Sequence, residues 1–401
     1  MTSAVIAPRR PRRPVPLDQV QARPEELERS VRRRLGIAWG LLFFNTLTYT
    51  GLAVLPIPSK LGKIGPQAAL PLAILILLTI NPKLKIRPNL FLCVMSLLCL
   101  GAMVAAPVGF GLGTAFRTFR LAEYILALWL LTPWFGRADM LLAKYHLRAL
   151  WCVLISVLVG IVISPGFAFA SGRLQGTIWP IYPTQLASYG AVAAGMVIVL
   201  LMGRHVSGRA ALAGVTLGIG ELLLSHTRTA LIGLVAGLIL AGLSLSNARV
   251  RRLFATTAAI AAVGVVLAAS AISSWLTRGE GVGGLRTLTG RTNFWTLVLN
   301  TPRTPFQEIF GFGITNASVN GLPIDSNWLS AYMEEGIFGV VVIALIFVVL
   351  YAVILLKASR LARALALFLV TYALIASFTE DTFSDVSTYF LHLTVAASLI
   401  T

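Results

Sequence analysis

Long apolar blocks separated by short basic connections are the feature that most constrains this sequence. Blocks of about 17 to 22 residues recur along the chain, and this is the length with which an α-helix crosses a hydrocarbon core of roughly 30 Å. A chain in that environment must satisfy its backbone hydrogen bonds internally, which each block does as a helix. The sequence therefore predicts an all-α integral membrane protein.

The composition excludes a water-soluble globular domain. Of the 401 residues, 57% are hydrophobic and only 12% are charged, and the mean hydropathy is +0.83. A soluble protein of this length carries roughly twice that share of charge. The lipid bilayer is thus the first expected partner.

We expect about twelve membrane-spanning helices, one long extracytoplasmic loop at 277–328 that contains short amphipathic helices, and a polar segment at 1–34. The polytopic membrane domain is 35–401. The expected spans are 35–57, 64–81, 89–107, 114–135, 147–165, 184–202, 209–225, 228–246, 253–276, 329–356, 361–378 and 385–401.

The net charge of +18 is explained by topology, so no nucleic-acid partner is expected. Lys and Arg recur in alternate connections, such as 82–88 and 247–252, and an excess of this kind marks the cytoplasmic side. Both termini are therefore predicted to be cytoplasmic. Residues 1–34 lack the apolar region of a cleaved signal peptide and predict a disordered basic tail that touches anionic lipid.

Cysteine usage points to neither a disulfide framework nor a metal centre. Cys93, Cys99 and Cys152 all fall inside expected spans, without an accompanying His/Cys cluster. We expect no metal and no cofactor.

The loop at 277–328 is long for a compact protein, and such loops are usually functional. In residues 292–299 apolar side chains recur three and four apart, which predicts a short helix along the membrane surface. Pro302 and Pro305 are expected to end it.

Basic residues on the outer side are informative because topology does not explain them. Arg173, Arg228 and Arg291 each lie beside glycine or hydroxyl residues. A planar guanidinium binds phosphate oxygens through two parallel hydrogen bonds, so several at one membrane face suit a diphosphate. The alternative for each is a snorkelling or ion-paired arginine.

Two further arginines, Arg117 and Arg120, lie on the outer part of the fourth expected span. Their side chains are interpreted either as an internal salt bridge to Glu123 or as substrate contacts.

Asp325 is the candidate general base. It stands where the long loop re-enters the membrane and could take the proton from a sugar hydroxyl that attacks an anomeric carbon. The alternative is that Asp325 or Ser326 caps the following helix. Glu334, Glu335 and Glu221 are buried-charge signals, typical of structural partners for arginines.

Several fragments, in this order, resemble the O-antigen ligase and polysaccharide polymerase superfamily of membrane glycosyltransferases. The resemblance covers roughly 115–385. It depends on Gly172 to Gly176 with Pro183, on Thr227 to Leu231, on Gly290-Arg291 followed by Trp295, on Gly311-Phe312-Gly313, and on Asp325 to Leu329 running to Glu334 to Gly339.

The resemblance implies a metal-independent transferase of the bacterial plasma membrane. Its donor is a polyprenyl-diphosphate-linked glycan, and its acceptor is a hydroxyl of a second glycan or glycolipid. Arg228, Arg291 and Asp325 would be catalytic. Together with the charged residues described above, the expected substrate-binding residues are Arg173, Arg117, Arg120, Asn327, Glu334 and Glu335.

One departure bears on the acceptor. Ligases of this superfamily usually have a histidine directly before the asparagine, and Ser326 stands there in this chain. Serine is a poor base, which favours a polymerase, or a ligase onto a different acceptor, over a lipopolysaccharide ligase. A transporter or flippase of lipid-linked oligosaccharides is the chief alternative function, and a non-catalytic scaffold is the third. The oligomeric state is not indicated by the sequence.

Overall fold

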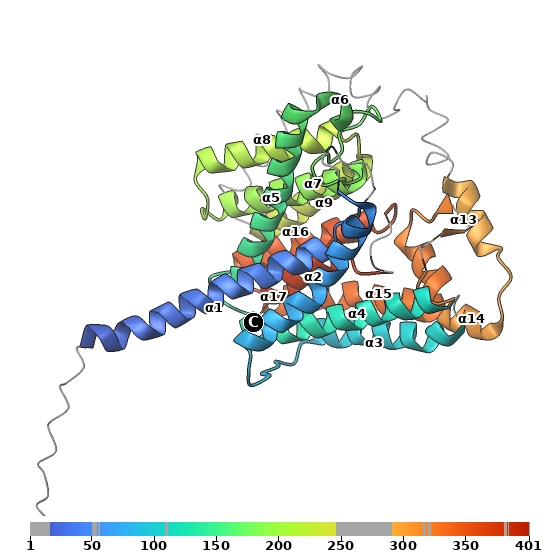
Figure 1. Ribbon diagram of the computed structural model, residues 1–401, viewed down its shortest axis with the longest axis horizontal. Helices are drawn as coiled ribbons and strands as arrows, with labels where there is room; N and C mark the ends of the chain where they lie inside the picture. Colours follow the sequence, from blue (N-terminus) through green and yellow to red (C-terminus); the bar gives the residue numbers. More distant parts are fainter. Residues whose placement is uncertain are drawn as a thin grey trace, which may run out of the picture.

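The computed structural model describes residues 17–49, 54, 57–108, 111–245, 291–315, 318–319, 322–380, 383 and 385–400. Within these ranges the protein is mostly helical (Figure 1). The elements are α1 (Leu17–Asn45), α2 (Ser59–Ile80), α3 (Leu90–Ala105), α4 (Leu112–Leu131), α5 (Leu141–Ile163), α6 (Pro165–Ala168), α7 (Pro183–Met202), α8 (Gly208–Leu224), α9 (Arg228–Leu245), α13 (Arg291–Leu299), α14 (Pro305–Phe310), β1 (Ser318–Val319), β2 (Leu322–Pro323), α15 (Asn327–Lys357), α16 (Arg360–Ala376) and α17 (Thr388–Ser398).

The architecture is that of a helical membrane protein. Five of the described helices contain segments long and apolar enough to cross a bilayer. Each expected span inside the described ranges overlaps a helix, whereas 253–276 lies outside them. The total of about twelve spans stays a prediction. The five segments are Lys60–Ile80, Leu141–Ile163, Pro183–Met202, Arg228–Leu245 and Asn327–Lys357.

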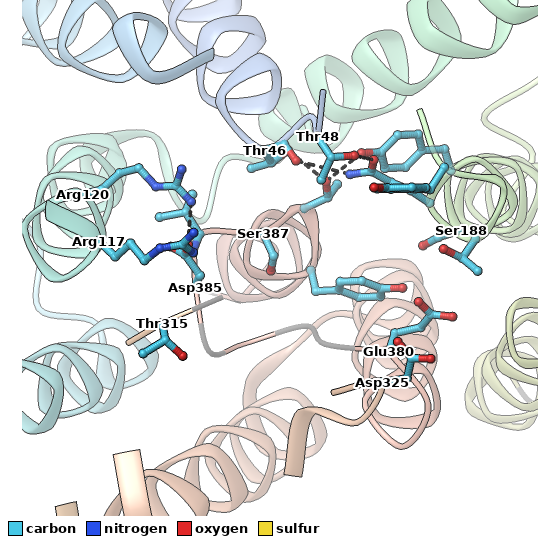
Figure 2. Close-up of a pocket in the computed structure, with 17 residues that line it drawn as sticks. Thr46, Thr48, Arg117, Arg120, Ser188, Thr315, Asp325, Glu380, Asp385 and Ser387 are labelled. Atoms are coloured by element: carbon cyan, nitrogen blue, oxygen red, sulfur yellow. Dashed lines mark hydrogen bonds and ion pairs between the residues drawn. The ribbon is translucent and has the colours of Figure 1, made fainter. Parts of the chain in front are cut away.

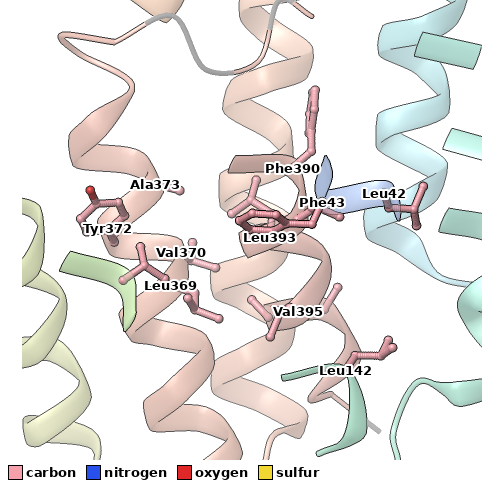
Figure 3. Packing of buried hydrophobic residues seen from close by; sticks show 14 of the residues in the cluster. Leu42, Phe43, Leu142, Leu369, Val370, Tyr372, Ala373, Phe390, Leu393 and Val395 are labelled. Atoms are coloured by element: carbon pink, nitrogen blue, oxygen red, sulfur yellow. The ribbon is translucent and has the colours of Figure 1, made fainter. Parts of the chain in front are cut away.

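The core lies around α16 and α17. Figure 3 shows side chains of both helices, among them Leu369 and Phe390, packed with Phe43 of α1 and Leu142 of α5. Small residues allow this closeness: a Cβ at Gly195 of α7 would overlap the ring of Phe368. Lipid tails are as apolar as these side chains, so close van der Waals packing stabilises the helix contacts.

Helix α1 differs from its expected range at both ends. It ends at Asn45, not at residue 57, and the Asn45 amide donates a 2.7 Å hydrogen bond to the Pro66 carbonyl of α2. At its start, α1 is helical from Leu17, inside the segment expected to be disordered. Glu28 and Arg32 stabilise this part as an i,i+4 ion pair of 2.9 Å. The hydrogen bond from Arg32 also lowers the pKa of Glu28.

The described part of the long loop contains the short helix expected at 292–299, as α13. Arg303, after α13, donates to the Tyr332 carbonyl at 2.8 Å and lies 3.8 Å from the centre of the Tyr332 ring. Burial lowers the pKa of Arg303 from its ordinary value. These contacts join the loop to α15, so Arg303 stabilises the packing of the loop against this helix.

Helix α15 is kinked at Gly336, which has a φ of 67°. Carbonyls before such a break lose their helical partners. Here they accept from the neighbouring loop instead: Phe312 N–H bonds to Met333 O at 3.0 Å and Gly313 N–H bonds to Glu334 O at 2.8 Å. A Cβ on Gly336 would overlap the backbone of Ile309 and Gly311. Two fragments of the resemblance, at 311–313 and 334–339, are thus packed against each other.

We expect Gly336→Ala to destabilise the protein by at least about 2 kcal/mol, since alanine is strained at this φ and its Cβ collides with backbone. Thermal unfolding in detergent measures the effect. Gly220→Ala is the control, because a Cβ there meets nothing within 4 Å. Equal unfolding temperatures for the two variants would contradict the close packing of Gly336 against the backbone of Ile309 and Gly311.

Candidate functional site

A polar cavity of about 400 Å³ lies between the end of α1, α4, the start of α7, and the connections that precede α15 and α17. Its wall contains charges of both signs (Figure 2). Most of the uncharged residues in the wall carry hydroxyl groups, and Gln185 adds an amide. The hydroxyl residues are Thr46, Thr48, Tyr182, Thr184, Ser188, Tyr189, Thr315, Ser387, Thr388 and Tyr389. A wall of this kind suits a ligand that is rich in hydroxyls.

Two arginines of α4 share one carboxylate at the edge of the cavity. Arg117 and Arg120 are three residues apart, hence on one helix face, and each lies 2.9 Å from Oδ2 of Asp385. Oδ1 of Asp385 accepts from the Val386 N–H at 2.6 Å. The salt bridge expected from the sequence therefore exists, but with Asp385 in place of Glu123. Among the described residues of this edge, two guanidinium groups thus share the carboxylate of Asp385.

One donor of this arginine pair is unused. Nε of Arg120 is buried and has no hydrogen-bond partner among the described residues. A buried charged donor without a partner is costly. It is therefore available to an anionic ligand.

Two carboxylates lie across the cavity from the arginines, as Figure 2 shows for Asp325 and Glu380. Asp325 precedes α15, and Glu380 follows α16. Ser326, not Asp325, occupies the N-cap position of α15, and its side chain makes no capping hydrogen bond. Asp325 is thus part of the cavity wall, directly before the N-terminus of α15, and its carboxylate is placed to contact a hydroxyl of a bound ligand.

The hydroxyl side chains form a connected network. Thr388 Oγ1 lies 2.8 Å from Thr46 Oγ1 and 3.0 Å from the Tyr189 hydroxyl. The Thr48 hydroxyl donates to Gln185 Oε1 at 2.7 Å. The network joins α1, α7 and α17, so the cavity wall is held by three helices far apart in the sequence.

Asn327 positions the connection between α16 and α17. It is fully buried, its backbone N–H donates to Ser377 O at 3.0 Å, and its side-chain oxygen accepts from Phe383 N–H at 2.7 Å. Asn327 does not line the cavity. It fixes the segment that carries Glu380 and Asp385.

The two glutamates of α15 also lie behind the wall. Glu334 Oε1 accepts from the N–H and the hydroxyl of Thr315, at 2.6 and 2.9 Å. Thr315 lines the cavity, whereas Glu334 and Glu335 are each 1% exposed and do not. Through these two hydrogen bonds Glu334 holds Thr315 in the cavity wall.

Of the arginines expected to bind diphosphate, Arg173 and Arg228 do not line the cavity. Arg173 donates to Ser225 O at 2.9 Å and to Thr227 Oγ1 at 3.0 Å, which fastens the turn between α8 and α9. Arg228 begins α9, and its buried Nε has no hydrogen-bond partner among the described residues. Arg291 begins α13, but its side chain lies outside the described part.

Arg228 is nevertheless close to one flank of the cavity. The next residue, Thr229, contacts Thr379 through their hydroxyls, and Thr379 precedes Glu380 in the wall. The residues that sequence reasoning left without a role are Glu380, Asp385 and the hydroxyl set. Asp385 lies 268 residues from Arg117 in the sequence, so no local pattern links them.

In the described ranges, no group of three His, Cys, Asp or Glu side chains is placed to hold a metal ion. Comparison of the sequence with models of protein families finds no match. The curated proteins searched contain no match either.

We expect Arg173→Gln to lower stability by about 1.5 to 3 kcal/mol, the range for a hydrogen bond from a charged group. Specific activity per folded molecule should stay within about twofold, because Arg173 does not line the cavity. Thermal unfolding and an assay normalised to folded protein check both parts, with the exposed Arg204→Gln as control. Full stability with lost activity would return Arg173 to the substrate site.

Proposed function

We propose that the protein is a membrane glycosyltransferase that transfers a glycan from a polyprenyl-diphosphate donor to a hydroxyl of a second glycan or glycolipid. The reaction belongs to the extracytoplasmic side of the bacterial plasma membrane. The supporting observation is the cavity of about 400 Å³ that has an arginine pair on one side and two carboxylates on the other. This volume falls within the roughly 300 to 1,000 Å³ of small-molecule sites.

The arginine pair is the proposed diphosphate site. Guanidinium groups bind phosphate oxygens in pairs, and Arg120 retains an unused buried Nε–H. Asp385 occupies one Nη of each arginine. A diphosphate therefore binds by competing with Asp385 or by using the remaining donors. When no lipid-linked glycan is bound, Asp385 keeps the side chains of Arg117 and Arg120 directed at the cavity.

The carboxylate side is the proposed acceptor site. Asp325 accepts the proton of the acceptor hydroxyl while that oxygen forms a bond to the anomeric carbon. The bond from the anomeric carbon to the diphosphate oxygen breaks, and polyprenyl diphosphate leaves with the electron pair. The hydroxyl network between the two sides supplies hydrogen bonds to sugar hydroxyls.

The membrane location suits this chemistry. The polyprenyl chain stays among the lipids, the diphosphate meets the arginines, and the sugars enter the polar cavity. The proposal favours a polymerase, or a ligase for an acceptor other than lipopolysaccharide, because Ser326 replaces the usual histidine.

A transporter or flippase for lipid-linked glycans is the second candidate, and one observation favours it. Glu221 of α8 is 2% exposed, and its carboxylate oxygens have no hydrogen-bond partner among the described residues. Intramembrane carboxylates often belong to transport pathways. We prefer the transferase because Glu221 lines a separate apolar groove, with Leu158 and Leu217, and not the polar cavity.

Comparison of cells with and without the gene separates these functions. Accumulated single repeats on the lipid carrier indicate a polymerase, and long undelivered chains indicate a ligase. Precursors that accumulate on the cytoplasmic leaflet indicate a flippase and would overturn the transferase.

We expect Arg117→Ala and Arg120→Ala each to lower transfer roughly 100-fold, the usual loss for one group that stabilises developing negative charge. Arg120→Lys should restore little, since lysine lacks the paired donors. The assay is turnover of lipid-linked glycan in proteoliposomes made with membrane extracts. Exposed Arg360→Ala is the control, and near-normal turnover in both alanine variants would remove the diphosphate site.

We expect Asp325→Asn to lower transfer at least about tenfold, and typically by more, because amides do not accept the proton. Glu380→Gln should cost less if Glu380 only binds the acceptor. Exposed Glu308→Gln is the matched control. Full activity in both Asp325→Asn and Glu380→Gln would contradict acceptor activation by this side of the cavity.

A further inference from the structure

A second pocket, distinct from the polar cavity, lies between α1 and α5. It has a volume of about 670 Å³. Four basic side chains, from Arg32, Arg33, Lys144 and Arg148, contribute to its wall. Among the described residues that line it, none is acidic. We call it the basic groove.

Most of this charge is uncompensated. Arg32 is paired with Glu28 at 2.9 Å and with Asp139 at 3.2 Å. By contrast, Arg33, Lys144 and Arg148 form no ion pair with any described residue. Three like charges around one groove repel each other, and a bound anion removes that repulsion.

The floor of the groove is apolar. It is formed by Gly36, Ile37 and Gly40 of α1 with Ala149 and Cys152 of α5. Ile37 is 48% exposed, and a Cβ built on Gly40 would meet nothing within 4 Å. On α1 the basic residues precede the apolar floor, and on α5 Lys144 and Arg148 precede Ala149 and Cys152, although Leu141 lies before them. The floor therefore lies C-terminal to the basic residues on both helices.

The edge of the groove is held in a fixed shape. The Tyr145 hydroxyl donates to Arg32 O at 2.6 Å, and the Arg148 guanidinium carbon lies 5.8 Å from the centre of the Tyr145 ring. A Cβ on Gly36 would lie 3.1 Å from the Tyr145 ring, so the two helices are in contact there. One turn further along α1, at Gly40, the space beside the helix is open.

We propose that the basic groove is a binding site for an anionic phospholipid of the adjacent leaflet. The phosphate lies among Lys144, Arg148 and Arg33, and one acyl chain lies along Ile37, Gly40 and Cys152. Charge complementarity favours a head group with net negative charge, and basic pockets between membrane helices bind such head groups. The exposed apolar floor favours a ligand with an attached chain over free phosphate. The proposal does not depend on the transferase activity.

The test uses the full chain, purified in nonionic detergent and stripped of lipid. Phosphatidylglycerol or phosphatidylcholine with identical acyl chains is added, and bound copies are counted by native mass spectrometry. We expect at least a tenfold preference for phosphatidylglycerol and a higher unfolding temperature when it is bound. Equal binding of the two lipids would overturn the proposal.

Variants separate the head-group contacts from the chain contacts. Lys144→Gln combined with Arg148→Gln should weaken phosphatidylglycerol binding roughly tenfold or more. Lys83→Gln combined with Lys357→Gln removes two exposed charges elsewhere and should leave binding unchanged. Binding by the groove double variant equal to the wild type would overturn the head-group site.

Gly40→Leu tests the apolar floor with every charge retained. Leucine favours the helix over glycine and projects into the open space. The variant should therefore fold and lose phosphatidylglycerol binding. Undiminished binding by a folded Gly40→Leu protein would overturn the chain site, and this variant decides the matter if the double charge variant does not fold.

Discussion

The rest of the structure depends on one requirement, that backbone polar groups in a membrane protein find partners within the protein. Helices meet it locally, but two parts of the cavity wall, the connections that precede α15 and α17, are not helical. The kink at Gly336 provides partners for the loop before α15, because the carbonyls of Met333 and Glu334 accept hydrogen bonds from the N–H groups at 312–313. Asn327 provides partners for the connection before α17 by bonding to Ser377 and Phe383. Helix α15 thus provides the partners for both irregular walls of the cavity.

This arrangement explains why few polar residues of α15 touch the cavity. Asn327 and Glu334 act on it through the segments they hold, Asn327 through the connection to α17 and Glu334 through Thr315. Their substitution would displace Asp385 or Thr315 without removing a ligand group. The opposite charges of the cavity then arise from different elements, with the cations on α4 and the carboxylates on connections that α15 organises.

The helical fold was predictable because apolar blocks of membrane-spanning length are read directly from the sequence. The candidate site was predictable only in part. Asp325 was predicted because it marks the point where the loop returns to the membrane. The opposite side of the cavity was not, because the ion pair of Arg117 with Asp385 joins positions 268 residues apart in the sequence. Arg173 shows the ambiguity of local reading, since small neighbours suit a guanidinium that bonds phosphate and equally one that bonds the carbonyl of Ser225. At the early end of α1, Asn45 bonds to the Pro66 carbonyl of α2, a contact between helices that hydropathy does not encode.

Helix α1 connects the two polar regions of the molecule. Its residues Gly36 and Gly40 border the basic groove, while Thr46, just after its last turn, belongs to the hydroxyl network of the cavity. At a rise of about 1.5 Å per residue, Gly36 and Asn45 are separated by roughly 14 Å along one rigid helix. The end near the cavity is fixed by the bond from Asn45 to Pro66. Near the groove, the Tyr145 hydroxyl holds the Arg32 carbonyl, but the space beside Gly40 is open. A phospholipid in the groove would fill this space beside α1, and through the helix it would stabilise the position of Thr46 in the cavity wall.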